Sequence, residues 1–127
     1  MTAPNLKSPT TITAKTFGDT LSSTSRVGII TNIASSNKVY KVNSIFCANI
    51  SNTQNVKISI SIHNLSIGDA GIGVTYHVAK DIPILTQTTQ IISSKDTYFY
   101  LEENVKLQAQ AEYANTIDVV VGYEELS

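Results

Sequence analysis

Residues 56–63 read VKISISIH, and this stretch decides the fold class. Valine and isoleucine occupy every second position, and lysine, serine and histidine occupy the positions between them. Successive side chains of a β-strand point to opposite faces of the sheet, so the alternation gives the strand one apolar and one polar face. We therefore predict a half-buried β-strand that covers a hydrophobic core.

The same alternation recurs along the chain, most clearly in residues 105–111 and 116–123. No stretch repeats apolar residues at helical spacing, and Ser, Asn, Asp and Gly separate the apolar runs. Further strands are predicted over residues 26–33, 39–50, 74–79, 87–93 and 97–101. Short strands at this spacing predict an all-β fold, a two-sheet antiparallel β-sandwich of jelly-roll type.

Two local irregularities place strands within the sheets. Residues 45–48 read IFCA and break the alternation, as expected for a central strand that is covered on both faces or bent by a bulge. Pro83 lacks the N–H that a ladder needs, so its segment is expected at a sheet edge or a crossover.

Length, charge and cysteine content exclude several classes of protein. The chain has 127 residues, a net charge of -1 and scattered basic residues, which fits one domain and argues against a nucleic-acid partner. The single cysteine cannot form an internal disulfide, which favours folding in the cytoplasm. Residues 1–9 do not resemble a signal peptide, and no run approaches the roughly 20 apolar residues of a membrane span. We expect no membrane partner.

The N-terminal residues differ from the rest of the chain in composition. Residues 1–19 contain two prolines and a threonine-rich stretch, and we expect an extended N-terminal arm before one β-sandwich domain over residues 20–127. Such an arm is either a frayed terminus or a strap laid on a neighbouring subunit by strand addition. The glycine-rich loop NLSIGDAGIG at 64–73 is unusually apolar for an exposed loop. Apolar residues of the two segments are the predicted interface: Leu6, Pro9, Ile12, Ile67 and Ile72.

No constellation of residues indicates catalysis or a cofactor. His63 and His77 are expected on neighbouring strands as ordinary solvent-face histidines, with a metal site shared with Asp69 or Asp81 as the alternative. The glycine-rich loop lacks the Lys-Ser/Thr step of a phosphate-binding loop. We predict no metal, no cofactor and no enzymatic activity.

The remaining reactive or aromatic side chains are expected to have structural roles. Cys47 lies within an apolar run and is expected to be buried. The carboxylate pairs at 102–103 and 124–125 are expected to be solvated strand ends. In residues 98–100, YFY, we expect one core phenylalanine and two rim tyrosines, with a stacking platform for sugars or bases as the alternative.

Four stretches together resemble a known class of protein. They are KSPTTITAKT at 7–16, SNKVYKVNSIFCANIS at 36–51, YFYLEENVKLQAQA at 98–111 and TIDVVVGYEE at 116–125. The chain is similar to small β-sandwich virion structural proteins of tailed phages, especially contractile-tailed phages of marine cyanobacteria. The resemblance implies a structural role.

Within that class, the expected function is that of a capsid decoration, or cement, protein. Its partners would be the major capsid protein lattice and neighbouring copies of itself, with a trimer or dimer as the oligomer. It would be made in the host cytoplasm and located on the capsid surface of the virion. A neck, tail or fibre-attachment protein and a carbohydrate-binding receptor module are the alternatives.

Overall fold

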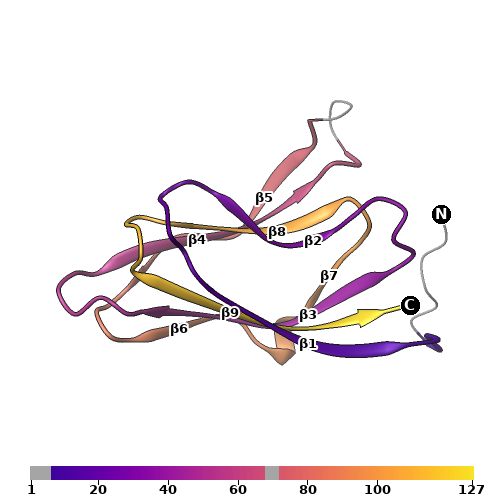
Figure 1. Cartoon of the computed structure of the whole chain (residues 1–127), viewed down its shortest axis with the longest axis horizontal. Helices are drawn as coiled ribbons and strands as arrows, with labels where there is room; N and C mark the ends of the chain where they lie inside the picture. Colours follow the sequence, from indigo (N-terminus) through magenta and orange to yellow (C-terminus); the bar gives the residue numbers. More distant parts are fainter. Residues whose placement is uncertain (1–6, 68–71) are drawn as a thin grey trace.

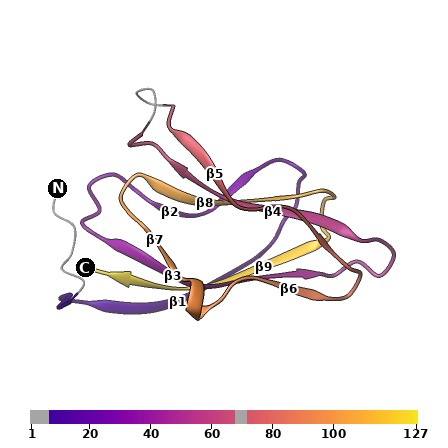
Figure 2. The same cartoon turned by 180° about the vertical axis from the view of Figure 1, so that it is seen from behind.

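The computed structural model describes residues 7–67 and 72–127 and confirms the predicted all-β sandwich. Figures 1 and 2 show two layers of strands from opposite sides. The elements are β1 (Ile12–Thr20), β2 (Val27–Asn32), β3 (Val39–Asn49), β4 (Val56–Asn64), β5 (Val74–Ile84), β6 (Thr89–Ser93), the 3-10 turn η1 (Lys95–Thr97), β7 (Phe99–Leu101), β8 (Val105–Ala111) and β9 (Ile117–Leu126).

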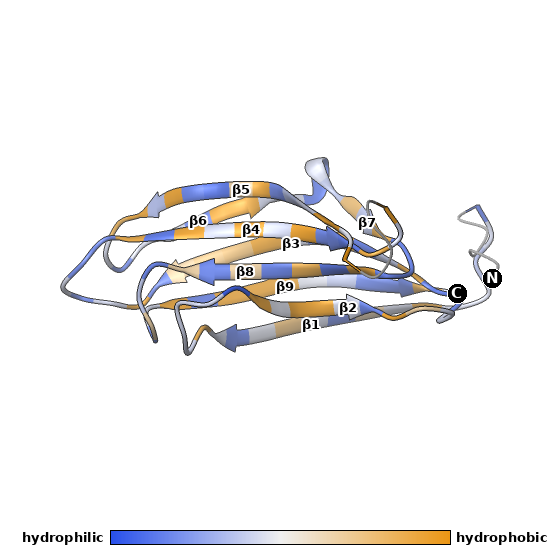
Figure 3. Cartoon of the chain, turned by 90° about the horizontal axis from the view of Figure 1, so that it is seen from above, coloured by the Kyte–Doolittle hydropathy of each residue, from blue (hydrophilic) through white to orange (hydrophobic). Residues whose placement is uncertain are grey.

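The strands form two antiparallel sheets. Sheet A has the order β1-β9-β3-β6, with β7 also paired to β3, and sheet B has the order β2-β8-β4-β5. Figure 3 shows sheet B lying over sheet A. Strands that are neighbours in a sheet are mostly distant in sequence, so the two layers form one interlocked body.

The core lies between the sheets and consists of the alternating apolar residues. Val56, Ile58 and Ile60 of β4 are fully buried, as the alternation in VKISISIH predicts. The corresponding residues of β8 and β9 complete the centre of the core: Leu107, Ala109, Ala111, Ile117, Val119 and Val121. Bands of hydrophobic and hydrophilic residues alternate along these strands in Figure 3.

Both predictions about irregular segments are confirmed. β3 is central in sheet A, and its register shifts at Val42/Ser44 against β9 and at Ile45/Phe46 against β6. These bulges account for the broken alternation of the run IFCA. β5, which contains Pro83, is an edge strand of sheet B.

The expected arm over residues 1–19 is corrected by the position of β1. Strand β1 pairs with β9 in continuous register from Ile12↔Leu126 to Thr20↔Asp118, so it belongs to the sandwich. Before it, the amides of Thr10 and Thr11 donate to the carbonyl of Ser127. The threonine-rich sequence has little apolar surface to bury. Main-chain hydrogen bonds can nevertheless hold a strand in a sheet, because they do not depend on apolar side chains.

Two buried asparagines connect the sheets at opposite ends of the sandwich. The Asn32 amide, at the end of β2, donates to the carbonyls of Lys38 (2.8 Å) and Leu101 (3.0 Å). The Asn49 amide, at the end of β3, donates to the carbonyls of Gln54 (3.0 Å) and Ile84 (2.9 Å). Each side chain therefore satisfies carbonyls where a strand ladder stops.

Candidate functional site

Several connections meet at one end of the sandwich, the end at which β9 finishes. The main-chain N–H of Asn104 donates to the carbonyl of Asn32 (2.8 Å), and the main-chain N–H of Leu65 donates to the main-chain carbonyl of Asn104 (3.0 Å). These bonds join the turn before β8, the loop after β2 and the start of the β4–β5 connection. Figure 1 shows the described parts of the β4–β5 hairpin rising away from sheet B on this side.

Apolar side chains are exposed on these loops. Ile33 and Ile72 retain 65% and 66% of their accessible surface, and Leu65 and Ile67 are also exposed. We call these four residues the apolar loop end. Ile33, Leu65 and Val105 line a cavity of about 190 Å³ together with Ala34 and polar neighbours. Apolar side chains gathered on adjacent loops beside a cavity are typical of an interaction surface, whereas single exposed ones are ordinary.

The four predicted interface residues that the structure describes lie on two separate segments, around the start of β1 and in the β4–β5 connection. Ile67 and Ile72 lie on the same hairpin within the apolar loop end. Ile12 is exposed but lies in β1 opposite Leu126, and Pro9 is partly buried. Leu6 lies outside the described residues.

Ile33 and Leu65 were missed because each follows the last residue of a strand. The register shift between Gly28 and Ile30 interrupts the alternation of β2, so periodicity does not assign a face to Ile33. Main-chain hydrogen bonds of Asn104 to Asn32 and Leu65 bring the two segments together.

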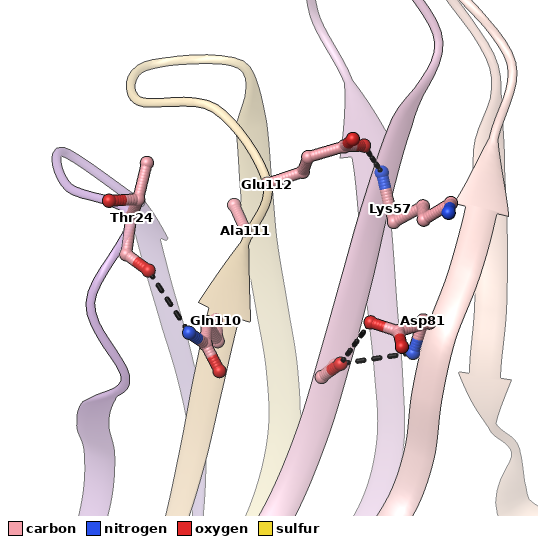
Figure 4. Close-up of a pocket in the computed structure, with 7 residues that line it drawn as sticks. Thr24, Lys57, Asp81, Gln110, Ala111 and Glu112 are labelled. Carbon is pink, nitrogen blue, oxygen red and sulfur yellow. Dashed lines mark hydrogen bonds between the residues drawn. The ribbon is translucent and has the colours of Figure 1, made fainter.

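A second candidate is a polar groove on sheet B near the other end of the sandwich. It has a volume of about 440 Å³, and Figure 4 shows the residues that line it. They come from the β1–β2 connection, β4, β5 and the end of β8: Thr24, Lys57, Ser59, Asp81, Gln110, Ala111 and Glu112. We call this the polar groove.

Hydrogen bonds hold the groups of the polar groove. The Lys57 main-chain amide donates to the Glu112 carboxylate (3.0 Å), and the Gln110 side chain donates to the Thr24 carbonyl (3.2 Å). Asp81 has φ of 51° and donates its main-chain amide to the Ser59 hydroxyl (3.0 Å). A non-glycine residue in this conformation is strained. Carboxylate and amide groups held in this way can bind a polar, hydroxyl-rich ligand.

The two histidines have separate surroundings. His63 Nε2 lies 2.9 Å from the carbonyl of Ile72, which can only accept, so Nε2 donates and Nδ1 accepts from the Thr75 hydroxyl at 2.7 Å in the neutral ring. His77 lies opposite Ser61. Among residues 7–67 and 72–127, no three His, Cys, Asp or Glu side chains gather closely enough to hold a metal. Asp69 lies outside the described residues.

The expectation of solvated carboxylates is wrong for Glu103 and Glu125. The Glu103 carboxylate is buried without a hydrogen-bond partner. Glu125 forms ion pairs with Lys15 and Lys38 and accepts a hydrogen bond from Tyr40. The hydrogen bond from Lys15 is the main reason that the pKa of Glu125 is lowered.

The remaining side chains lie as predicted. Cys47 is fully buried, and this burial raises its pKa to about 12. Phe99 packs against the core, whereas Tyr98 and Tyr100 are exposed and meet edge to face at 5.7 Å between ring centroids. Lys41 Nζ lies 4.3 Å from the Tyr98 ring centroid. No helix in the described part of the chain is long and apolar enough to cross a membrane.

Comparison with known proteins yields a likeness of fold. No protein-family model and no curated protein matches the chain. A chain in the crystal structure of the T13 infectious bursal disease virus particle matches with a TM-score of 0.51 and 10% identity, over 94% of this chain and 31% of that chain. A chain of the Gx strain of the same virus matches with a TM-score of 0.50 and 13% identity, over 94% and 33%. This chain therefore spans about a third of the chains it matches.

Proposed function

We propose that the protein is a virion structural protein that decorates the assembled head of a tailed phage and stabilises its lattice. The fold it shares with a chain of a virus particle supports a structural role in a virion. The resemblance of its four sequence stretches supports the tailed-phage assignment. The observation that carries the proposal is the apolar loop end, which offers a surface for contact with another protein.

Such a surface suits a repetitive partner. The apolar loop end is small, so a single contact is weak, but an icosahedral lattice presents the same partner many times. A protein with several linked contacts gains affinity through its high effective concentration at the second site. Capsid subunits and neighbouring copies of the chain are therefore the partners we propose.

Counting the protein in purified particles distinguishes decoration from the neck or tail alternative. Quantitative mass spectrometry against the major capsid protein should give hundreds of copies if the chain covers the lattice. A low multiple of about six or twelve would place it at a vertex, the neck or the tail. Absence from the particles would overturn the virion role.

Substitutions at the apolar loop end test the contact itself. We expect Ile33→Asp and Ile72→Asp to weaken co-sedimentation with particles that lack the protein by at least about tenfold, because a buried charge would oppose binding. Ile91→Asp changes an equally apolar, exposed residue of β6 and is the matched control. Thermal unfolding should show that all three variants stay folded. Unchanged binding by both loop-end variants would remove this surface from the proposal.

A carbohydrate-binding receptor module is the second candidate, and the polar groove favours it. Its fixed carboxylates and amide could accept and donate hydrogen bonds to sugar hydroxyls. A glycan array with the purified chain tests this function. Specific binding that is lost in Asp81→Asn and kept in Asp96→Asn would support a receptor module over a cement protein.

We further propose that the chain has no enzymatic activity. Its thiol is buried with a raised pKa, and both nitrogens of His63 are occupied by local hydrogen bonds. These groups are poorly placed to act as a nucleophile or a base.

A further inference from the structure

The edge strands of the two sheets differ in how they are protected against pairing with another chain. An unpaired edge can bind a strand from another molecule, and proteins block this with short strands, prolines and bulges. β2 has a register shift next to Gly28, and β5 contains Pro83 and the positive φ of Asp81. β6 has five residues and β7 has three. Each of these edges carries at least one such device.

β1 is not short and has no proline or bulge, and its two charged residues, Lys15 and Asp19, are opposite in sign. It runs for nine residues in unbroken register with β9 and contains no proline. Within residues 7–67 and 72–127, no strand pairs with its other side. Figure 3 shows it as the outermost strand along that side of the sandwich. Its outer main-chain groups are therefore available to another strand.

The side chains of one β1 strand are complementary to those of a second, antiparallel β1 strand. Lys15, Phe17 and Asp19 lie at alternate positions and share the face that is turned toward sheet B, where Lys15 reaches Glu125 and Phe17 packs against the core. If a second β1 pairs antiparallel about Phe17, Lys15 of each copy lies opposite Asp19 of the other. Opposite charges and aromatic pairs at directly opposed positions stabilise such ladders.

We propose that two copies of the chain associate through antiparallel pairing of their β1 strands, with Phe17 at the two-fold axis. The pairing joins the two A sheets into one continuous sheet. The Asp19 side chain has no hydrogen-bond or ion-pair partner among the described residues, and Phe17 is only partly buried. Both therefore gain a partner in the dimer, while Lys15 lies between Glu125 of its own copy and Asp19 of the other.

Disulfide cross-linking tests this register directly. A mixture of Lys15→Cys and Asp19→Cys proteins should form disulfide-linked dimers on mild oxidation, because directly opposed residues lie within disulfide range. Each variant alone should not, since its two cysteines would be four positions out of register. A mixture of Thr13→Cys and Asp19→Cys is the matched control, two positions out of register. Cys47 is buried and does not interfere.

Analytical ultracentrifugation of the full chain provides the second measurement. The wild type should sediment as a dimer at high concentration. Asp19→Lys should weaken the dimer at least tenfold, because it places like charges opposite each other. Asp96→Lys makes the same change on η1 and should leave the dimer intact. A monomeric wild type with no cross-linking in the Lys15→Cys/Asp19→Cys mixture would overturn the inference. The experiments need no particle, so their result is independent of the virion role.

Discussion

Asn32 illustrates how a single buried polar residue can secure a β-sandwich. Replacing it with alanine leaves the carbonyls of Lys38 and Leu101 without their donor inside the protein. We expect Asn32→Ala to lower the free energy of unfolding by about 2–4 kcal/mol, since an unsatisfied buried group costs about 1–3 kcal/mol and the partly buried bond to Lys38 adds less than the buried bond to Leu101. Urea denaturation measures this change. Asn52→Ala, at an exposed turn position, should stay within about 0.5 kcal/mol of the wild type, and equal losses in both variants would contradict the prediction.

Glu125 gives the protein a defined sensitivity to acid. Its pKa is lowered in the folded state, chiefly by the hydrogen bond from Lys15. Ionised Glu125 therefore contributes stability above the unfolded pKa, near the ordinary value of 4.5, and this contribution is lost as the pH falls through the lower folded pKa. We expect the melting temperature of the wild type to fall more steeply below about pH 4.5 than that of Glu125→Gln. If the melting temperatures of the two proteins fell equally with pH, Glu125 would not be the cause of the acid sensitivity.

At the level of the strands, the sequence predicted most of the fold. Alternation located β4, β8 and β9, and the run IFCA and Pro83 correctly marked a central strand and an edge. It failed for β1, because the stretch 12–20 has little apolar pattern and its attachment depends on main-chain bonds to a strand about a hundred residues later. Main-chain pairing leaves no residue-specific signal in a sequence.

The position of β1 makes a truncation experiment informative. Deleting residues 1–16 removes five of the nine β1 residues, Ile12 to Thr16, and uncovers the facing part of β9. We expect a loss of stability of a few kcal/mol, since each backbone hydrogen bond contributes roughly 0.5–1.5 kcal/mol. Deleting residues 1–9 leaves the whole of β1 and should have a much smaller effect. Chemical denaturation of the two truncated proteins measures the difference, and equal stability would indicate that β1 is only loosely attached.

At the level of the whole molecule, the two candidate sites could not be predicted because each is assembled from distant segments. The polar groove joins Lys57, Asp81 and Glu112 from three separate strand regions. The apolar loop end joins Ile33 to Leu65 through the turn at Asn104. Ile67 and Ile72 could be singled out from the sequence because two large apolar residues are unusual in a glycine-rich loop. Both are exposed in the structure, and their part in an interface stays a prediction. A site assembled from distant segments can be predicted only when the strand order is known. The periodicity of the sequence does not reveal the strand order.

The strand order also predicts how the molecule opens. β9, β3, β8 and β4 each have partners on both sides, whereas β1 pairs with β9 alone among the residues that the structure describes. In hydrogen exchange at low protein concentration, amides of the central strands should exchange roughly 100-fold more slowly than those of β1, because edge strands open without unfolding the core. Raising the concentration should then slow exchange in β1 alone, as pairing with a second β1 covers its outer groups. Equal protection of β1 and β9 at low concentration would contradict the first expectation, and protection of β1 that does not change with concentration would contradict the second.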